Sequence, residues 1–299
     1  MKHMHSEWRS RLDHWLNTLT QDVYQPIAPL NLEGMLTMDH LTLKEAQKGS
    51  YKPMPQGTRW GKTYEYCWLR DTVKIPKEYE GQRIVMNLPL GGEAAVFVNG
   101  EPFGTYRSNW VQIPLHYMED NYLTTKAKAG ETFEVYIEAY AGQYIAESRF
   151  GGCATGPILP GSYQDPYKEG ERALIGNCTY GVWNEDAFQL MLDVQLLMQL
   201  MEEVNVESLR ADKIASALEQ FTLTVDFEQP KEQRNADYRR ARKELRAVMA
   251  AENGSTVPQF YAIGNAHLDM AWLWALAATE RKTASTFAAQ LRLLEEYPD

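Results

Sequence analysis

Cysteine is scarce in this chain of 299 residues, and the three that occur, Cys67, Cys153 and Cys178, are widely spaced. Small secreted proteins held by disulfides use many cysteines in an even number, so that class is excluded and reduced thiols are expected. Long apolar runs are also missing, since no segment approaches the roughly eighteen consecutive apolar residues that a membrane span requires. The charged first ten residues lack the apolar stretch of a secretory signal peptide. We therefore expect a cytoplasmic protein without a membrane anchor.

Basic residues are outnumbered as well. The chain has 30 Lys and Arg against 40 Asp and Glu, which gives a formal net charge of −10. A surface of this sign repels phosphate, so neither nucleic acid nor anionic lipid is an expected partner. The most basic segment, 231–251, also contains three acidic residues, and such a run is usually the solvated face of a helix.

What is present is a chain long enough for two domains, each with a core of its own. Residues 1–57 begin with an amphipathic helix over 6–19 and continue as an irregular, turn-rich lead. Residues 58–145 alternate between apolar and polar with a period of two, which predicts short strands. The dipeptide Asn99-Gly100 between two of these strands is a strong hairpin signal. This part of the chain therefore predicts an antiparallel β-sandwich.

Glycine and proline are frequent over residues 146–182, which predicts a long irregular connection. Residues 183–253 have helical periodicity and predict a helical linker. Residues 256–299 begin with an apolar run of strand length, 259–264, and end in a helix from about Leu276 to Tyr297. A strand, a polar loop and a helix form one β/α unit. The expected fold class is thus multidomain α+β: a sandwich, a helical segment and the start of an α/β barrel-type catalytic domain.

The loop of this β/α unit contains the candidate site. His267 and Asp269 stand two residues apart within an otherwise apolar run. A carboxylate in such surroundings is costly to desolvate unless it is paired or bound to a metal. Side chains at i and i+2 of an extended segment point the same way, and imidazole with carboxylate suits zinc or a similar divalent metal. A bare His-x-Asp pattern is weak, because a loop histidine beside a capping aspartate is the commoner arrangement.

Two stretches of sequence resemble known families. The pattern Tyr-x-x-x-Trp-Leu-Arg at 64–70, followed by Gly-Glu-Ala-x-Val-Phe-Val-Asn-Gly-Glu-Pro-x-Gly at 92–104, resembles the jelly-roll domains that precede many glycoside hydrolase barrels. The run from Gly264 to Trp274, with Glu-Arg-Lys-Thr at 280–283, resembles the opening motif of family 38 α-mannosidases. The motif resembles most the branch of this family that includes cytosolic and bacterial enzymes. The Golgi and lysosomal branch has Pro-Gly where this chain has Met-Ala.

This resemblance covers residues 258–299 tightly and the rest of the chain loosely. It implies a jelly-roll-like sandwich and a retaining, metal-dependent α-mannosidase that acts on mannose-containing oligosaccharides. It also implies that His267 and Asp269 are two ligands of one zinc or other divalent ion, and that Trp272 stacks against the sugar. In the family the nucleophilic aspartate, a further metal-binding histidine and the acid/base lie well downstream of this motif. No catalytic residue is therefore expected among residues 1–299, and the chain alone should be inactive.

Two other functions stay open. A different metal-dependent carbohydrate hydrolase, such as a deacetylase, would need further histidines near a helix and no sandwich ahead of the motif. A non-enzymatic carbohydrate-binding module would expose aromatic side chains on the sandwich, for which the candidates are Trp60, Trp68, Tyr106 and Trp110. Packing inside the sandwich explains these four residues better. An exposed apolar surface around 271–294 is also expected, which leaves a homo-oligomer open.

Overall fold

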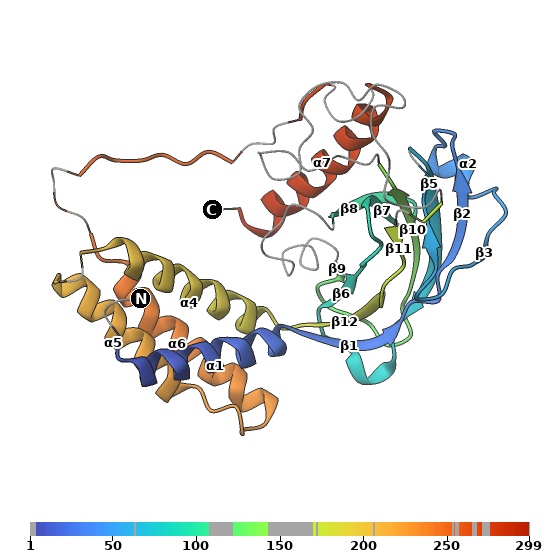
Figure 1. Ribbon diagram of the computed structural model, residues 1–299. Helices are drawn as coiled ribbons and strands as arrows, with labels where there is room; N and C mark the ends of the chain where they lie inside the picture. The colour runs from blue at the N-terminus through green and yellow to red at the C-terminus, as the bar shows by residue number, and fades with distance from the viewer. Residues whose placement is uncertain are drawn as a thin grey trace. The chain divides into compact units, whose positions relative to one another are not determined.

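The computed structural model describes residues 4–62, 64–107, 122–142, 170–171, 173–205, 207–252, 254, 257–264, 268–270 and 276–298. The chain forms two compact units, and each is assembled from segments that are distant in the sequence (Figure 1). The first unit comprises residues 1–25 and 183–263, and the second comprises residues 26–182 and 264–299. The chain thus leaves the first unit after one helix, builds most of the second, and then returns.

Four helices build the described part of the first unit: α1 (Ser6–Val23), α4 (Glu185–Glu203), α5 (Leu209–Thr224) and α6 (Lys231–Met249). The side chains of Asn184 and Ser208 accept hydrogen bonds from the first-turn amides of α4 and α5, which satisfies donors that a helix start otherwise leaves unpaired. Helix α1 contacts both α4 and α5, and its Leu12 and Leu19 are fully buried. The expected helices are confirmed, but α1 packs with 183–253 into one unit and does not belong to a separate lead.

The second unit contains a β-sandwich whose two main sheets enclose its core. The four-stranded sheet has the order β1 (Tyr24–Pro29), β12 (Thr179–Trp183), β6 (Ile84–Asn87) and β9 (Tyr122–Thr124). The six-stranded sheet has the order β3 (Lys52–Pro53), β2 (Glu33–Thr37), β5 (Tyr66–Lys74), β10 (Thr132–Tyr140), β7 (Glu93–Val98) and β8 (Glu101–Arg107). A short pair joins β11 (Ala173–Leu174) to β4 (Arg59–Trp60), and two short helices, α2 (Leu43–Ala46) and η1 (Lys77–Tyr79), lie in connections.

Alternation along the strands decides which side chains enter this core. On β10, Val135, Ile137 and Ala139 are fully buried between the sheets. The intervening Tyr136 and Glu138 therefore point to the outer face of the six-stranded sheet. Strand β10 pairs antiparallel with both β5 and β7, so it lies at the centre of this sheet. The expected antiparallel sandwich within a multidomain α+β protein is confirmed.

The predicted hairpin is confirmed too. Asn99 and Gly100 join β7 to β8, with Val98 opposite Glu101 in the register. Both turn residues have positive φ, 52° and 87°. A two-residue turn whose twist matches its strands needs this left-handed backbone, and asparagine followed by glycine adopts it at the lowest cost.

The boundaries predicted for the sandwich are too narrow. Strands β1, β2 and β3 precede residue 58, so the expected lead at 1–57 is largely part of the sandwich. Strands β11 and β12 follow residue 145 and lie in the expected irregular connection at 146–182, whose residues 146–169 are outside the described ones. The local pattern does not reveal β1, which contains two prolines, or β12, which contains a glycine. Their pairing with distant strands, as in β12 with β6, is what makes them strands.

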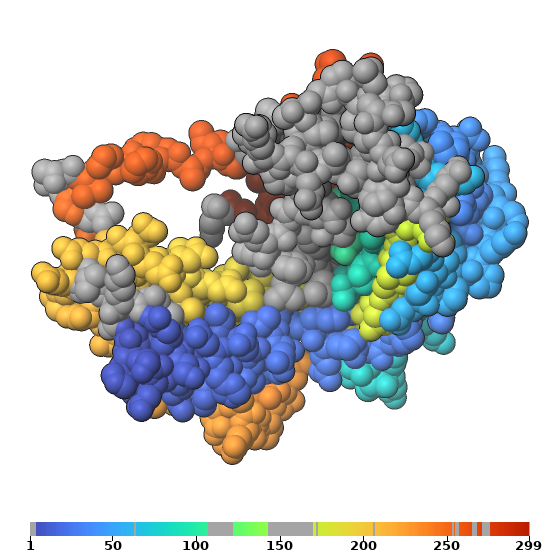
Figure 2. All heavy atoms as spheres, viewed as in Figure 1, coloured from blue at the N-terminus to red at the C-terminus, as the bar shows by residue number. Residues whose placement is uncertain are grey.

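The predicted strand at 259–264 is wrong as well. Residues 257–264 are extended but belong to none of the sheets formed by the described residues. Phe260, Tyr261 and Ile263 are 88%, 81% and 85% exposed, and the space-filling view shows this segment as a thin orange stretch (Figure 2). A strand requires a neighbour for its backbone groups, and no described strand supplies one here. The following helix is confirmed as α7 (Leu276–Glu296).

No helix in the described ranges is long and apolar enough to cross a membrane.

Candidate functional site

The predicted metal loop connects the extended segment 257–264 to α7. Of its three candidate residues, Asp269 is described and is partly buried, whereas His267 and Trp272 lie outside the described residues. Among the residues that are described, no group of three or more His, Cys, Asp and Glu side chains is placed to hold a metal ion. Met270 in this loop is tied to α7, because the Thr279 hydroxyl donates a hydrogen bond to its carbonyl.

Within the second unit, helix α7 lies beside β7 and β8 (Figure 1). Charged residues make this contact. At the start of the helix, Arg281 forms an ion pair with Glu138 on β10, and Lys282 forms one with Glu93 on β7. Both acidic residues occupy outward-facing strand positions, so the helix covers part of the outer face of the six-stranded sheet.

The second half of α7 is held in a similar way. The Arg292 guanidinium donates hydrogen bonds to the backbone carbonyls of Phe103 and Tyr122. It also lies 3.5 Å from the ring centre of Phe103 and 3.8 Å from that of Tyr122, which is well within cation–π range. Near the end of the helix, Glu296 forms an ion pair with Arg83.

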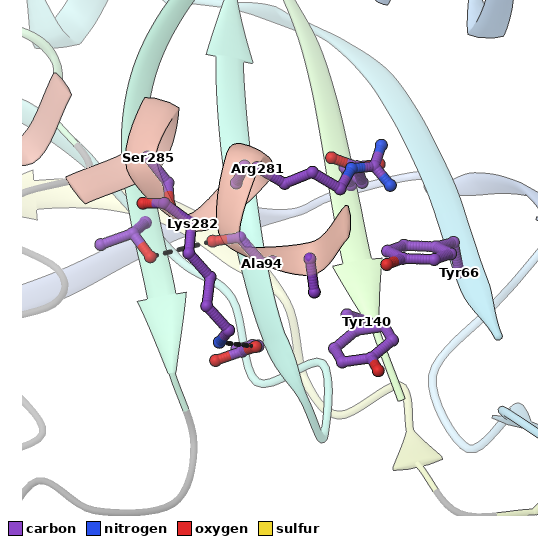
Figure 3. Close-up of a pocket in the computed structure, with 11 residues that line it drawn as sticks. Tyr66, Ala94, Tyr140, Arg281, Lys282 and Ser285 are labelled. Carbon is purple, nitrogen blue, oxygen red and sulfur yellow. Dashed lines mark hydrogen bonds and ion pairs between the residues drawn. The ribbon is translucent and has the colours of Figure 1, made fainter. Parts of the chain in front are cut away.

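A cavity of about 60 Å³ remains at the first of these contacts (Figure 3). Its walls include the rings of Tyr66 and Tyr140, which stack with centres 4.8 Å apart. Figure 3 shows Arg281 extended towards Tyr66 and Lys282 extended in another direction, towards a carboxylate. The cavity has room for water but is far smaller than the roughly 300 Å³ at which small-molecule pockets begin. It is therefore a gap in a polar interface and too small for a sugar.

Burial shapes the electrostatics of this interface. It lowers the pKa of Arg281 from its ordinary value, and the neighbouring Tyr66 partly offsets that shift. Burial likewise raises the pKa of Tyr66, with Arg281 acting in the opposite direction and Glu93 adding to the rise. A guanidinium nevertheless stays protonated at neutral pH. Arg281 and Lys282 thus face two carboxylates of the sheet, and the charges at this contact balance.

The aromatic candidates for sugar binding by the sandwich are not exposed platforms. Trp60 is 1% exposed in the core, where its Nε1 donates to the carbonyl of Leu90 at 3.2 Å. Trp68 is also 1% exposed and stacks on Phe97 at 5.8 Å. Tyr106 packs against the core from a partly buried position, and Trp110 lies outside the described residues. The packing expected inside the sandwich is confirmed for Trp60. Trp68 is buried too, but on the outer face of the six-stranded sheet, in a cluster with Ala46 and Tyr136.

Sequence reasoning did not single out the residues that hold α7. Glu93 and Glu138 occupy alternating strand positions that usually face solvent, so nothing local marks them as ion-paired. In the sequence, the basic pair at 281–282 stands out only through its resemblance to a family motif. The one further signal is that acidic outward positions on two neighbouring strands match two consecutive basic residues on a helix.

Comparison with known proteins adds an independent observation. The model of the α-mannosidase jelly roll domain matches residues 28–170, and that of the family 38 glycosyl hydrolase N-terminal domain matches residues 258–299. Human alpha-mannosidase 2C1 is 24% identical over an alignment of 311 positions, which covers 96% of this chain and 28% of that protein. The mouse protein of the same name is 23% identical over 270 residues, covering 90% of this chain and 24% of that one.

The chain thus spans about a quarter of the length of these curated relatives. Among solved structures, a β-glucuronidase from Ruminococcus gnavus in complex with D-glucuronic acid is 10% identical, with a TM-score of 0.35. That match covers 53% of this chain and 29% of the other. A likeness this low carries no argument about function.

Proposed function

Because this chain belongs to the α-mannosidases of glycosyl hydrolase family 38, we propose that it is the N-terminal part of a retaining, metal-dependent enzyme that hydrolyses α-mannosides of oligosaccharides. The match of residues 258–299 to the catalytic family carries this proposal, because those residues include the His267 and Asp269 motif. The jelly-roll match ahead of it supports the same conclusion. A deacetylase is not expected to have that sandwich ahead of the motif.

His267 and Asp269 are the proposed metal ligands, and Trp272 is the proposed sugar-stacking residue. Imidazole and carboxylate together suit zinc or another divalent ion, and Asp269 lies partly buried on a loop tied to α7. When bound, such a metal stabilises developing charge as a Lewis acid. Catalytic zinc sites usually have three protein ligands, so these two residues make up part of a site. We place the nucleophile, the acid/base and the remaining ligand beyond residue 299.

The setting follows from the same proposal. We place the protein in the cytoplasm, where reducing conditions suit the free, buried thiols of Cys67 and Cys178. Its proposed partner is a mannose-containing oligosaccharide, as the family matches suggest. The net charge of −10 disfavours nucleic acid.

Zinc binding and hydrolysis by the 299-residue chain test this function. We expect weak zinc binding by equilibrium dialysis, reduced at least about tenfold in both His267→Ala and Asp269→Asn. All proteins in the test carry His3→Ala and His5→Ala, which removes a competing pair at the N-terminus, and His14→Ala on α1 is the matched control. We also expect no hydrolysis of an aryl α-mannoside. Unchanged zinc affinity in both variants would remove these residues from the site, and turnover by the pure chain would place a nucleophile within it.

A further inference from the structure

Helix α7 is oriented unusually for a surface helix. Leu276, Phe287, Leu291 and Leu294 are 63%, 60%, 61% and 65% exposed, although the apolar stripe of such a helix normally faces the core. The opposite side of α7, which contacts the sandwich, carries its basic residues. The buried apolar side chains of α7 are the small Ala278 and Ala289, so apolar packing contributes little to holding the helix where it lies. Polar contacts are therefore the main determinant of its position.

Arg281 makes the first of these contacts, and it joins three separate parts of the second unit. It forms the ion pair with Glu138 on β10, and its Nη2 donates to the carbonyl of Leu41 at 3.0 Å. Its guanidinium also lies 4.4 Å from the ring centre of Tyr66 on β5. The side chains of Arg281 and Glu138 are only 16% and 7% exposed. A guanidinium has a planar fork of donors, so partners on three sides fix its place more tightly than a single ion pair would.

Arg292 makes the second contact, about three turns further along the helix. It is 9% exposed, and its partners, the carbonyls and rings of Phe103 and Tyr122, come from β8 and β9. Two separated anchors determine both the position and the direction of a rigid rod. A single anchor would leave the helix free to pivot.

The anchors lie close to the metal loop along the chain. Asp269 precedes the first residue of α7 by seven positions, and the bond from Thr279 to Met270 shortens the free part of that connection. Fixing the first turns of α7 therefore limits where the Asp269 carboxylate can lie.

We propose that the outer face of the six-stranded sheet is a docking surface for α7, and that Arg281 and Arg292 are positioning residues that hold the metal loop through this helix. Glu138 and Glu93 on this surface are the ion-pair partners of Arg281 and Lys282. In this proposal the sandwich is a scaffold for the metal loop. The role in metal binding rests on the proposed function, whereas the docking of α7 does not.

Hydrogen exchange of the amides in 276–296 tests the docking in the 299-residue chain. The single variants Glu138→Arg and Arg281→Glu each place like charges together and should speed exchange in α7 at least about tenfold. The double variant, which restores opposite charges, should recover most of the protection. Arg292→Met keeps an apolar stem but removes the donors, and should speed exchange mainly in the second half of the helix. The control is Arg239→Glu, whose ion pair with Asp186 lies in the first unit and whose loss should leave α7 unchanged.

Zinc affinity measured on the same proteins tests the positioning role. We expect the single variants to bind zinc about tenfold more weakly and the double variant to recover, although none of the changed residues is a ligand. Cys67 is buried in the sandwich core. If its thiol still reacts slowly with a thiol reagent in each variant, the sandwich is still folded. Exchange in α7 that stays the same in Glu138→Arg and in Arg292→Met would overturn the docking. Faster exchange with unchanged zinc affinity would overturn the positioning role. If the parent chain binds no zinc while α7 exchanges as expected, the proposed function fails and the docking stands.

Discussion

Arg281 on α7 and Glu138 on β10 form an ion pair whose side chains are mostly buried, although the two residues are far apart in the sequence. Each is the counter-charge of the other in surroundings that also include the ring of Tyr66. A buried pair of this kind contributes little net stability compared with apolar side chains of the same shape, but removing only one partner leaves an uncompensated charge. The pair is therefore a determinant of geometry more than a source of stability.

This asymmetry gives a double-mutant test. Glu138→Leu alone should lower the free energy of unfolding of the second unit by about 3 kcal/mol, whereas Glu138→Leu with Arg281→Met should cost less than about half of that. Glu33→Gln, which breaks a pair with Arg70 whose side chains are 37% and 43% exposed, should cost under about 1 kcal/mol. Urea denaturation measures these three variants and Arg281→Met alone, which completes the double-mutant cycle. Strictly additive single-mutant effects would show that the two charges do not depend on each other.

The two buried tryptophans of the sandwich differ in hydrogen bonding. Trp60 Nε1 donates to Leu90, whereas Trp68 Nε1 has no partner among the described residues. Trp60→Phe loses a buried hydrogen bond as well as volume, so it should destabilise the protein by about 1–2 kcal/mol more than Trp68→Phe. Thermal unfolding of the two variants, measured side by side, checks the difference. Equal losses of stability would mean that the Trp68 donor has an acceptor.

Two glycines with left-handed backbone provide another matched pair. Gly91 and Gly100 have φ of 80° and 87°, so a side chain at either position is strained by about 1–2 kcal/mol. At Gly91 an added Cβ would also lie 2.6 Å from the backbone nitrogen of Leu174, whereas at Gly100 it would meet nothing. Gly91→Ala should therefore be clearly the more destabilising of the two, by about 2 kcal/mol or more. Chemical denaturation measures the unfolding free energies of both variants. A Gly100→Ala variant that is no more stable than Gly91→Ala would contradict the prediction.

Burial of Cys67 and Cys178 predicts a specific pH dependence. Burial raises the pKa of both thiols from an ordinary value of 9.0, that of Cys178 to about 12. The folded state therefore keeps its protons to higher pH than the unfolded state. The stability that each neutral thiol contributes is complete below about pH 9 and is lost as the pH rises through the folded-state pKa.

Unfolding free energies between pH 8 and pH 10.5 measure this loss in a Cys153→Ser background. Introducing Cys178→Ala should make the decline with pH shallower. In the same background, a thiol reagent at pH 8 should label the native protein slowly and both remaining thiols rapidly in denaturant. Fast labelling of the native chain would show that these thiols are accessible.

Local signals in the sequence predicted a large part of the fold. The alternation over β10 and the Asn99-Gly100 turn are short-range features, and both are present as predicted. Helices α6 and α7 begin and end close to the predicted residues, because their apolar periodicity and breakers are local too. The membership of β2 and β12 in the sandwich could not be read locally. These strands are defined by pairing with β5 and β6, which lie at a distance in the sequence.

The candidate site also has a part that the sequence identifies and a part that depends on contacts between distant segments. A resemblance in sequence identified His267, Asp269 and Trp272, and their roles stay predictions. The pairing of Glu138 with Arg281 depends on how a strand and a helix meet, and no pattern along either element specifies that meeting. A glutamate at an outward strand position is ordinarily solvated, and only the helix across the sheet gives this one a partner.

The discontinuous first unit has a consequence for how the protein is made. Helix α1 leaves the ribosome early, but α4 and α5, against which it packs, are synthesised only after the whole sandwich sequence. At about 5–20 residues per second, that delay is on the order of ten seconds. Throughout it, Leu12 and Leu19 of the nascent chain lack the neighbours that finally bury them. The sandwich strands are synthesised first, so the helices of the first unit can pack together only after them. We therefore expect the nascent α1 to be a binding site for chaperones.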